Sequence, residues 1–262
     1  MQDEFDAKTV ASVAGRVIIV TGGGKGIGKV YGQRLAEAGA KIVVADIDAD
    51  ANNITVGSIK AAGGEAVAVA TDVSDPDATQ HMADVAVETY GRIDGLINNA
   101  SLMSVLPRRP WYEIPLDEWD SVMAVNVRGV FLCCRAVFPQ MQKQNKGKIV
   151  NISSSRFWEG TPNRLHYSTS KAGVIGLTRS LSREVGEFNI TVNAITPGFT
   201  LSDTQVASSG DYARQNLPDE IRAIRRHQFP EDLVGAVMFL TSDASDYITG
   251  QTINVDGGRS MH

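Results

Sequence analysis

Residues 17–48, VIIVTGGGKGIGKVYGQRLAEAGAKIVVADID, decide the fold of this 262-residue chain. A short apolar run enters a glycine-rich turn, an amphipathic segment follows, and a second apolar run ends at Asp46. Gly22, Gly26 and Gly28 let the backbone turn tightly and approach a pyrophosphate that rests on a helix N-terminus. Asp46 can accept hydrogen bonds from an adenosine ribose, or it could only cap a helix, which would leave the glycines unexplained.

The same alternation of apolar runs and amphipathic segments continues along the whole chain. It predicts an α/β protein with a single-domain Rossmann fold over residues 1–262, a doubly wound parallel sheet of seven strands with helices on both faces. The strands are expected at 16–20, 41–45, 66–70, 93–97, 148–152, 190–195 and 251–255. The helices are expected near 26–39, 50–62, 75–90, 117–145, 166–187 and 230–241.

Composition narrows the possible environments and partners. The net charge is −5 with both signs interspersed, so no basic stripe marks a nucleic-acid surface. No apolar run approaches the ~20 residues that span a bilayer, and the acidic N-terminus MQDEFDAK lacks a signal-peptide core. The only cysteines are the neighbours Cys133 and Cys134, which fit a reducing compartment and argue against a thiolate metal site. We therefore expect a cytoplasmic protein without a metal, nucleic-acid or membrane partner.

One segment departs from the alternation. Residues from about 199 to 229 are polar, lack a strand pattern and contain the basic cluster RAIRRH. They predict either a substrate lid or a pair of solvated surface helices.

The stretch YSTSK brings a phenol and an ammonium onto one helical face. Tyr167 and Lys171 are four residues apart, one turn of a helix. A neighbouring cation favours the phenolate and lowers a phenol pKa that is about 10 in water, too high for acid–base work at neutral pH. Composition alone gives roughly 0.2 such pairs, so the pair needs support from other motifs.

That support comes from a series of short motifs in a fixed order. They are TGGGKGIG (21–28), DV (72–73), NNAS (98–101), the asparagine of MAVNVRG, NISSS before YSTSK, PGFTLSD (197–203) and INVDGG (253–258). From about residue 15 to 258 the chain thereby resembles the short-chain dehydrogenases/reductases in their shorter, non-extended branch. Ser101 stands where the family usually has glycine, and Ser202 where many members have threonine.

The resemblance implies a role for each matching residue. Tyr167 would be the general acid/base, Lys171 would lower its pKa and hold the nicotinamide ribose, Ser154 would bind the same substrate oxygen, and Asn126 would hold a water of a proton relay. The cofactor-binding residues would be Gly22, Lys25, Gly26, Ile27, Gly28, Asp46, Ile47, Asp72, Val73, Asn99, Ala100, Tyr167, Lys171, Pro197, Gly198, Thr200 and Ser202. The resemblance also implies a homotetramer, with the helices at 117–145 and 166–187 as contact faces.

Cofactor choice depends on two opposing charges. Asp46 would repel the extra phosphate of NADP and favours NAD, whereas a basic residue in the glycine turn, here Lys25, pairs with that phosphate in NADP-dependent relatives. Because Asp46 acts at the ribose itself, the sequence predicts NAD.

Substrate-facing positions in this family carry large apolar side chains here. Six of these positions are large and apolar and predict a hydrophobic, ring-bearing substrate, although aromatic residues can also be the packed wall of a pocket. The predicted pocket residues are Ser101, Leu102, Met103, Phe157, Trp158, Phe199 and Leu201. Arg156, Arg164 or His166 could pair with a substrate carboxylate, and surface solvation is the alternative for each of them.

These expectations combine into an NAD-dependent oxidoreductase that interconverts a secondary alcohol and a ketone, with a small molecule as its partner. A 3-oxoacyl-thioester reductase would use the same motifs. A catalytically silent dinucleotide-sensing protein would be expected to have lost part of the Ser–Tyr–Lys set, which is intact.

Overall fold

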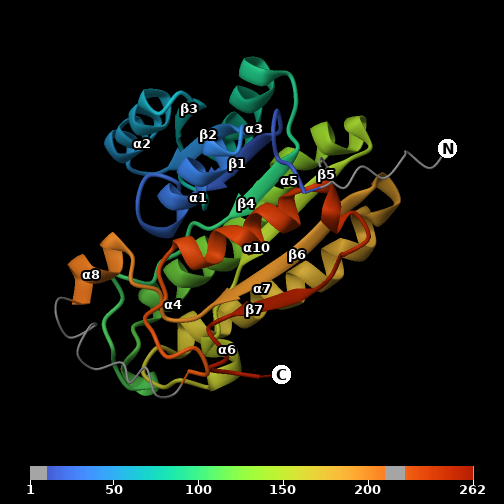
Figure 1. Ribbon diagram of the computed structural model, residues 1–262. Coiled ribbons are helices and arrows are strands. Elements are labelled where there is room, and N and C mark those ends of the chain that lie inside the picture. Colours follow the sequence, from blue (N-terminus) through green and yellow to red (C-terminus); the bar gives the residue numbers. More distant parts are fainter. Residues whose placement is uncertain (1–10, 210–221, 262) are drawn as a thin grey trace.

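The computed structural model describes residues 11–209 and 222–261, and in them seven parallel strands form one sheet (Figure 1). The strand order is β3-β2-β1-β4-β5-β6-β7, and every neighbouring pair is parallel. The doubly wound parallel sheet predicted from the sequence is therefore confirmed. The strands are β1 (Val17–Thr21), β2 (Lys41–Asp46), β3 (Glu65–Ala70), β4 (Gly95–Asn98), β5 (Gly147–Ile152), β6 (Ile190–Pro197) and β7 (Thr252–Val255).

Helices cover both faces of the sheet, because strands that are apolar on both sides need two apolar layers. One core cluster joins the sheet to α1 (Gly26–Glu37), α2 (Ala49–Ala61) and α10 (Glu231–Thr241). The other joins it to α3 (Pro76–Tyr90), α5 (Gly129–Gln144) and α7 (Leu165–Val185). Figure 1 shows α10 on the face of the sheet opposite α5 and α7.

Shorter elements lie between these helices. They are η1 (Trp111–Glu113), α4 (Leu116–Met123), η2 (Ala124–Arg128), α6 (Arg156–Glu159), η3 (Gly186–Phe188), α8 (Asp203–Ser209) and η5 (Asp243–Ser245). Of the expected lid at 199–229, the structure describes α8 and a bridge between Thr200 and Gln228, while residues 210–221 lie outside the described part.

One continuous helix runs through α4, η2 and α5, from Leu116 to Gln144. Its 29 residues include a window long and apolar enough to cross a membrane, contrary to the expectation that no stretch of the chain approaches that length. Half of that window is buried inside the protein, and Val130, Cys133 and Val137 belong to the core against the sheet. The apolar composition thus serves packing within this molecule.

The sheet has a topological switch point between β1 and β4. The chain runs outward from β1 to β3, then returns through α3 to β4 on the other side of β1. Ligands of doubly wound sheets bind beyond the carboxyl ends of the strands at such a point. The turns after β1, β4, β5 and β6 are therefore the place for a functional site.

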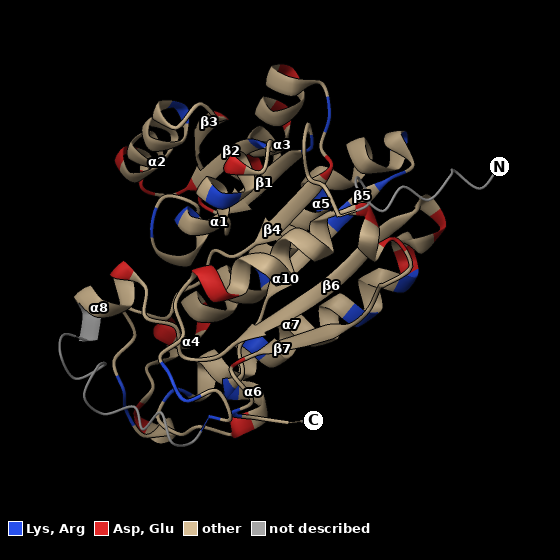
Figure 2. Ribbon diagram, in the orientation of Figure 1, with Lys and Arg blue, Asp and Glu red and all other residues tan. Residues whose placement is uncertain are grey.

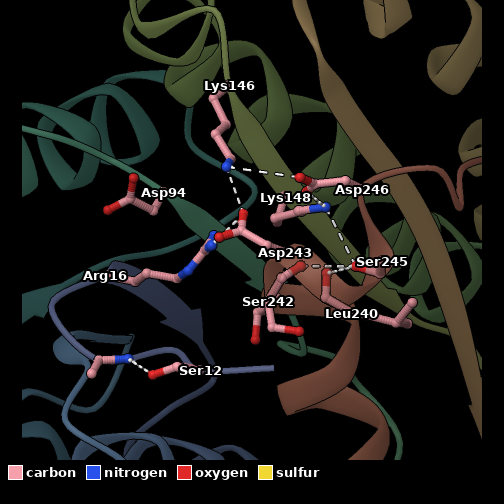
Figure 3. A network of polar contacts seen from close by, with 12 residues as sticks. Ser12, Arg16, Asp94, Lys146, Lys148, Leu240, Ser242, Asp243, Ser245 and Asp246 are labelled. Carbon is pink, nitrogen blue, oxygen red and sulfur yellow. Dashed lines mark hydrogen bonds and ion pairs between the residues drawn. The ribbon is translucent and has the colours of Figure 1, made fainter. Parts of the chain in front are cut away.

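The opposite, amino-terminal edge of the sheet holds a network of charges (Figure 3). Lys148, near the start of β5, is 1% exposed, and its ammonium lies 2.7 Å from the Asp246 carboxylate. Asp243 accepts ion pairs from Arg16 at 2.6 Å and from Lys146 at 2.5 Å. The network attaches η5 to the sheet, far from the carboxyl edge.

Candidate active site

The turn between β1 and α1 adopts a backbone conformation that strongly favours glycine. Gly22 and Gly26 have φ of +62° and +59°, in the left-handed region. A Cβ on Gly28 would lie 2.1 Å from the Gly22 carbonyl oxygen, so the turn folds directly against the first turn of the helix. The Asn99 side chain, after β4, donates to the carbonyls of Thr21 and Gly22 and fixes the turn against the neighbouring strand.

The carboxylate at the end of β2 faces this turn. Asp46 accepts hydrogen bonds from the Gly24 amide and from the Asp48 amide, both at 3.1 Å. Lys25 pairs with Asp48 at 2.5 Å, and the lysine side chain is exposed while the carboxylate is partly exposed. Asp48 also accepts from the Ala51 amide and so caps α2. The N-cap role that was the alternative reading for Asp46 therefore belongs to Asp48.

The N-terminus of α1 has an acidic neighbour from a distant segment. Asp203, the first residue of α8, accepts a hydrogen bond from the Gly26 amide at 2.9 Å. A Cβ on Gly26 would lie 2.8 Å from the Thr204 hydroxyl. The start of α8 is thus seated on the glycine turn.

Ser154, Tyr167 and Lys171 come together between the end of β5 and the first turns of α7. All three side chains are buried. The Lys171 ammonium donates to the Ile152 carbonyl at 2.8 Å and lies 5.8 Å from the centre of the Tyr167 ring. The Ser154 hydroxyl is close enough to the Tyr167 hydroxyl to lower the pKa of Tyr167. The expected one-turn spacing therefore places phenol and ammonium on one helical face.

Burial and nearby charges act in opposite directions on the Tyr167 proton. Burial raises the pKa of Tyr167, while the Ser154 hydrogen bond and the positive charges of Arg156 and Arg164 lower it. Burial also lowers the pKa of Lys171 to about 7, so only part of the population carries that charge at neutral pH. Arg156 and Arg164 thus add positive charge near Tyr167, besides the ammonium of Lys171 that the sequence predicts there.

Asn126 lies in the π-helical turn η2, at the middle of the long helix. Its side-chain oxygen accepts from the Leu102 amide at 2.8 Å, and its nitrogen donates to the Leu102 carbonyl and to the Ser170 hydroxyl. Ser170 in turn donates to the Tyr167 carbonyl. The Asn126 side chain therefore satisfies buried backbone and ties the loop after β4 to α7. Single π-helical turns within α-helices frequently occur at functional sites.

A cavity of about 510 Å³ runs along the carboxyl edge of the sheet. At one end it is lined by Asp46 and Asp72, at the other by Ser154, Tyr167 and Lys171. All of the cofactor-binding residues predicted from the sequence line it except Gly28, which packs behind Gly22. This shape, with a glycine turn at its side, fits a dinucleotide laid along the strand ends.

Only some of the residues predicted for the substrate pocket line the cavity. Ser101, Leu102, Met103 and Phe199 line the cavity. Phe157, Trp158 and Leu201 do not line it: the two aromatic rings meet edge to face with their centres 4.6 Å apart, and Leu201 is buried in the protein. The single helical turn α6 rotates these rings away from the cavity and turns Arg156 toward it.

The substrate end is lined instead by polar residues that sequence reasoning missed. They are Ser104, Arg108, Glu159, Thr161, Gln205 and Arg259, together with the foreseen Arg156 and Arg164. His166 is outside the lining and lies 3.2 Å from Glu118. Arg108 and Arg259 come from loops far apart in the chain, and no local sequence pattern predicts that either of them lines the cavity.

Comparisons with known proteins agree with this geometry. The family model described as enoyl-(acyl carrier protein) reductase matches residues 22–260. The chain is 38% identical to the 3-oxoacyl-[acyl-carrier-protein] reductase of Synechocystis over 256 residues, 96% of this chain and 100% of the relative.

Solved structures resemble it over nearly its whole length. A short-chain type dehydrogenase/reductase from Mycobacterium marinum has a TM-score of 0.87 and 32% identity, with 97% of this chain and 98% of that chain covered. A 7α-hydroxysteroid dehydrogenase complexed with NADH and 7-oxo glycochenodeoxycholic acid has a TM-score of 0.86 and 32% identity, with 99% of each chain covered.

Proposed function

Because the chain belongs to the short-chain dehydrogenase/reductase family, and is thus an oxidoreductase with a nicotinamide cofactor, we propose that it interconverts a secondary alcohol and a ketone with NAD(H). The observation that carries the proposal is the meeting of Ser154, Tyr167 and Lys171 at one end of the cavity that begins at the glycine turn. The intact set argues against a silent dinucleotide sensor.

Each residue has a task that follows from its position. When bound, the nicotinamide supplies or accepts the hydride. In the reductive direction Tyr167 donates its hydroxyl proton to the substrate oxygen, and in the oxidative direction the phenolate takes that proton back. Ser154 donates a hydrogen bond to the same oxygen and stabilises the charge that develops there. Lys171, next to the Tyr167 ring, would resupply the proton and would hold the nicotinamide ribose of a bound cofactor.

NAD is the proposed cofactor because of the charges at the end of β2. The Asp46 carboxylate lines the cavity beside the glycine turn, where the extra phosphate of NADP would meet it. Lys25, the residue that could pair with such a phosphate, is already paired with Asp48. Both the position of Asp46 and the pairing of Lys25 with Asp48 therefore support the proposed preference for NAD.

A 3-oxoacyl-thioester reductase is the second candidate, and the relative from Synechocystis favours it. The chemistry at Tyr167 would be the same, because a 3-oxo group is also a ketone. The two candidates differ in the rest of the substrate, so a thioester and a simple ketone separate them.

We also propose a homotetramer assembled through the long helix and α7. Phe131 on α5 is 50% exposed, and an exposed apolar ring on a core helix suits a subunit contact. Sedimentation at several protein concentrations tests this assembly.

The proposed reaction is tested with a panel of ketones, secondary alcohols and a 3-oxobutyryl thioester, followed at 340 nm with NADH or NAD. Tyr167→Phe keeps the ring packing and removes the proton, so turnover should fall at least ~10²-fold while cofactor affinity is retained. Near-normal turnover of Tyr167→Phe would overturn the assignment.

A further inference from the structure

Two guanidinium groups that have no carboxylate partner among residues 11–209 and 222–261 lie near Tyr167, and we propose that these groups, of Arg156 and Arg164, bind a carboxylate of the substrate. The substrate would then be an oxo acid or a hydroxy acid. This inference rests on the proposed function, because it concerns the substrate of the same site. Figure 2 shows basic positions gathered around α6, next to the C-terminal end of the chain.

Arg164 reaches the cavity from the start of α7, where it is the residue before Leu165 and three positions before Tyr167. Its guanidinium donates to the Leu106 carbonyl at 2.7 Å and contacts the Met103 sulfur at 3.1 Å. Its Nε is buried without a hydrogen-bond partner among the described residues. The backbone thus positions this cation but leaves its charge unneutralised.

Arg156 reaches the same end of the cavity from α6, two residues after Ser154. Its amide donates to the Ser154 hydroxyl at 3.3 Å, and its guanidinium donates to the carbonyls of Thr161 and Pro162. Its Nε is likewise buried and unpartnered within the described part of the chain. Both arginines are therefore held by carbonyl oxygens, which carry no net charge.

Glu159, an acid of α6 that lines the same cavity, already has partners. Glu159 pairs with Arg259 at 3.0 Å and accepts hydrogen bonds from Ser155 and Thr161. For the described residues 11–209 and 222–261, no ion pair joins Arg156 or Arg164 to a carboxylate.

Arg109, by contrast, does have a carboxylate partner, since it pairs with Glu118 at 3.3 Å. Arg108, which also lines the cavity, adds further positive charge to this end. Burial is the main cause that lowers the pKa of Arg156 and of Arg164, and the like charge of Arg108 lowers both further. A bound anion would relieve this repulsion.

The position of the two arginines in the cavity indicates which kind of anion they would bind. These arginines lie beside the reacting hydroxyls, at the opposite end of the cavity from Asp46, so they do not serve an adenosine phosphate. The planar guanidinium matches a carboxylate through paired hydrogen bonds. Two guanidiniums flanking Ser154 and Tyr167 would hold that carboxylate close to the ketone.

The arginines also lower the pKa of Tyr167, and the test must separate the two effects. An effect on Tyr167 changes the turnover of neutral and anionic substrates alike. Carboxylate binding changes only the anionic ones. A matched acid and ester therefore distinguish them.

The experiment compares 3-oxo- and 4-oxocyclohexanecarboxylate with their methyl esters and with a 3-oxobutyryl thioester of N-acetylcysteamine, using NADH and the wild-type protein. We expect kcat/KM of at least one acid to exceed that of its ester by at least ~10-fold, the discrimination of one charge-assisted pair. Arg156→Gln and Arg164→Gln should remove this ratio, while Arg183→Gln, an exposed arginine at the far end of α7, should keep it. Esters that equal or exceed both acids would overturn the inference and leave the proposed reaction standing.

A binding measurement makes the inference independent of turnover. Calorimetric titration of cyclohexanecarboxylate into the NADH-loaded protein should give at least ~10-fold tighter binding than cyclohexanecarboxamide, and either glutamine variant should abolish the difference. Equal affinity for the acid and the amide would overturn the inference. Failure of every ketone with NADH, together with tight carboxylate binding, would overturn the proposed reaction and keep the anion site.

Discussion

The Gly26 amide at the N-terminus of α1 donates a hydrogen bond of 2.9 Å to the carboxylate of Asp203, the first residue of α8. A helix N-terminus at a glycine turn is where a pyrophosphate rests in a dinucleotide site. Asp203 thus places one negative charge where the cofactor would bring another, and the two compete for the same amide.

Asp203→Asn should therefore bind NAD more tightly than the wild type. Removing a like charge at ~4 Å gains about 1 kcal/mol in water-like surroundings, which corresponds to roughly fivefold in Kd. Titration of the cofactor by calorimetry measures it, with Asp120→Asn, an exposed acid on α4, as the control. Weaker binding by Asp203→Asn would mean that this carboxylate supports the cofactor site.

The pH profile of alcohol oxidation should depend on Arg164. Oxidation needs Tyr167 as phenolate, so its rate rises as pH passes the Tyr167 pKa, which burial raises and the Ser154 bond and both arginines lower. Arg164→Gln removes a lowering charge, and kcat for a neutral alcohol should then rise at a pH about one unit higher. Arg183→Gln should show the wild-type profile. An unshifted profile for Arg164→Gln would remove that arginine from the control of the Tyr167 proton.

Lys171→Met should shift the same profile less than Arg164→Gln does. The pKa of Lys171 is lowered to about 7 by burial, so little of its charge remains at the alkaline pH where oxidation rises. The two variants are compared with one neutral alcohol at saturating NAD. A larger shift for Lys171→Met would show that Lys171 keeps its charge beside Tyr167.

The sequence predicted the sheet because its signals are local. The β1 strand, for example, is a fully buried run of apolar residues that ends at Thr21, and positive φ angles favour glycine at Gly22 and Gly26 of the β1–α1 turn. The meeting of Tyr167 and Lys171 likewise follows from helical spacing alone.

The substrate end could not be predicted in the same way. Phe157 and Trp158 follow the catalytic serine closely, but α6 has only four residues and shows no periodicity that would tell which side faces the cavity. Arg108 reaches the cavity from a loop after β4, and Arg259 comes from the chain end. The pairing of Lys25 with Asp48 also depends on how the β2–α2 turn meets the glycine turn. Such contacts between distant loops are a property of the folded chain.

Cofactor preference should respond to the acids at the end of β2. Asp46 is expected to favour NAD over NADP by at least ~10²-fold in kcat/KM, since like charges near a protein surface repel by several kcal/mol at contact. Asp46→Ser should narrow the gap mainly by improving NADP. Adding Asp48→Ser should narrow it further, because serine still caps α2 while Lys25 is released from its ion pair. Equal use of both cofactors by the wild type would overturn the NAD assignment.

Lys148 and Asp246 form an ion pair (Figure 3), and replacing one partner should change the free energy of unfolding more than replacing the other. Lys148 is 1% exposed and Asp246 is 53% exposed. Asp246→Ala leaves a buried ammonium without its main partner and should cost about 2 kcal/mol of unfolding free energy. Lys148→Met removes the buried charge and leaves a carboxylate that water can solvate, so it should change stability by no more than about 1 kcal/mol.

Urea unfolding at one fixed protein concentration measures these variants, with Asp120→Ala as the control for loss of an exposed acid. The double variant should resemble Lys148→Met alone, because the ammonium that needed Asp246 is gone. Burial already lowers the pKa of Lys148, and the loss of Asp246 lowers it further. Raising the pH toward that pKa discharges the folded lysine, so the deficit of Asp246→Ala should shrink as pH increases. A larger loss for Lys148→Met than for Asp246→Ala would show that the lysine stem, or its hydrogen bonds within the sheet edge, matters more than the uncompensated charge.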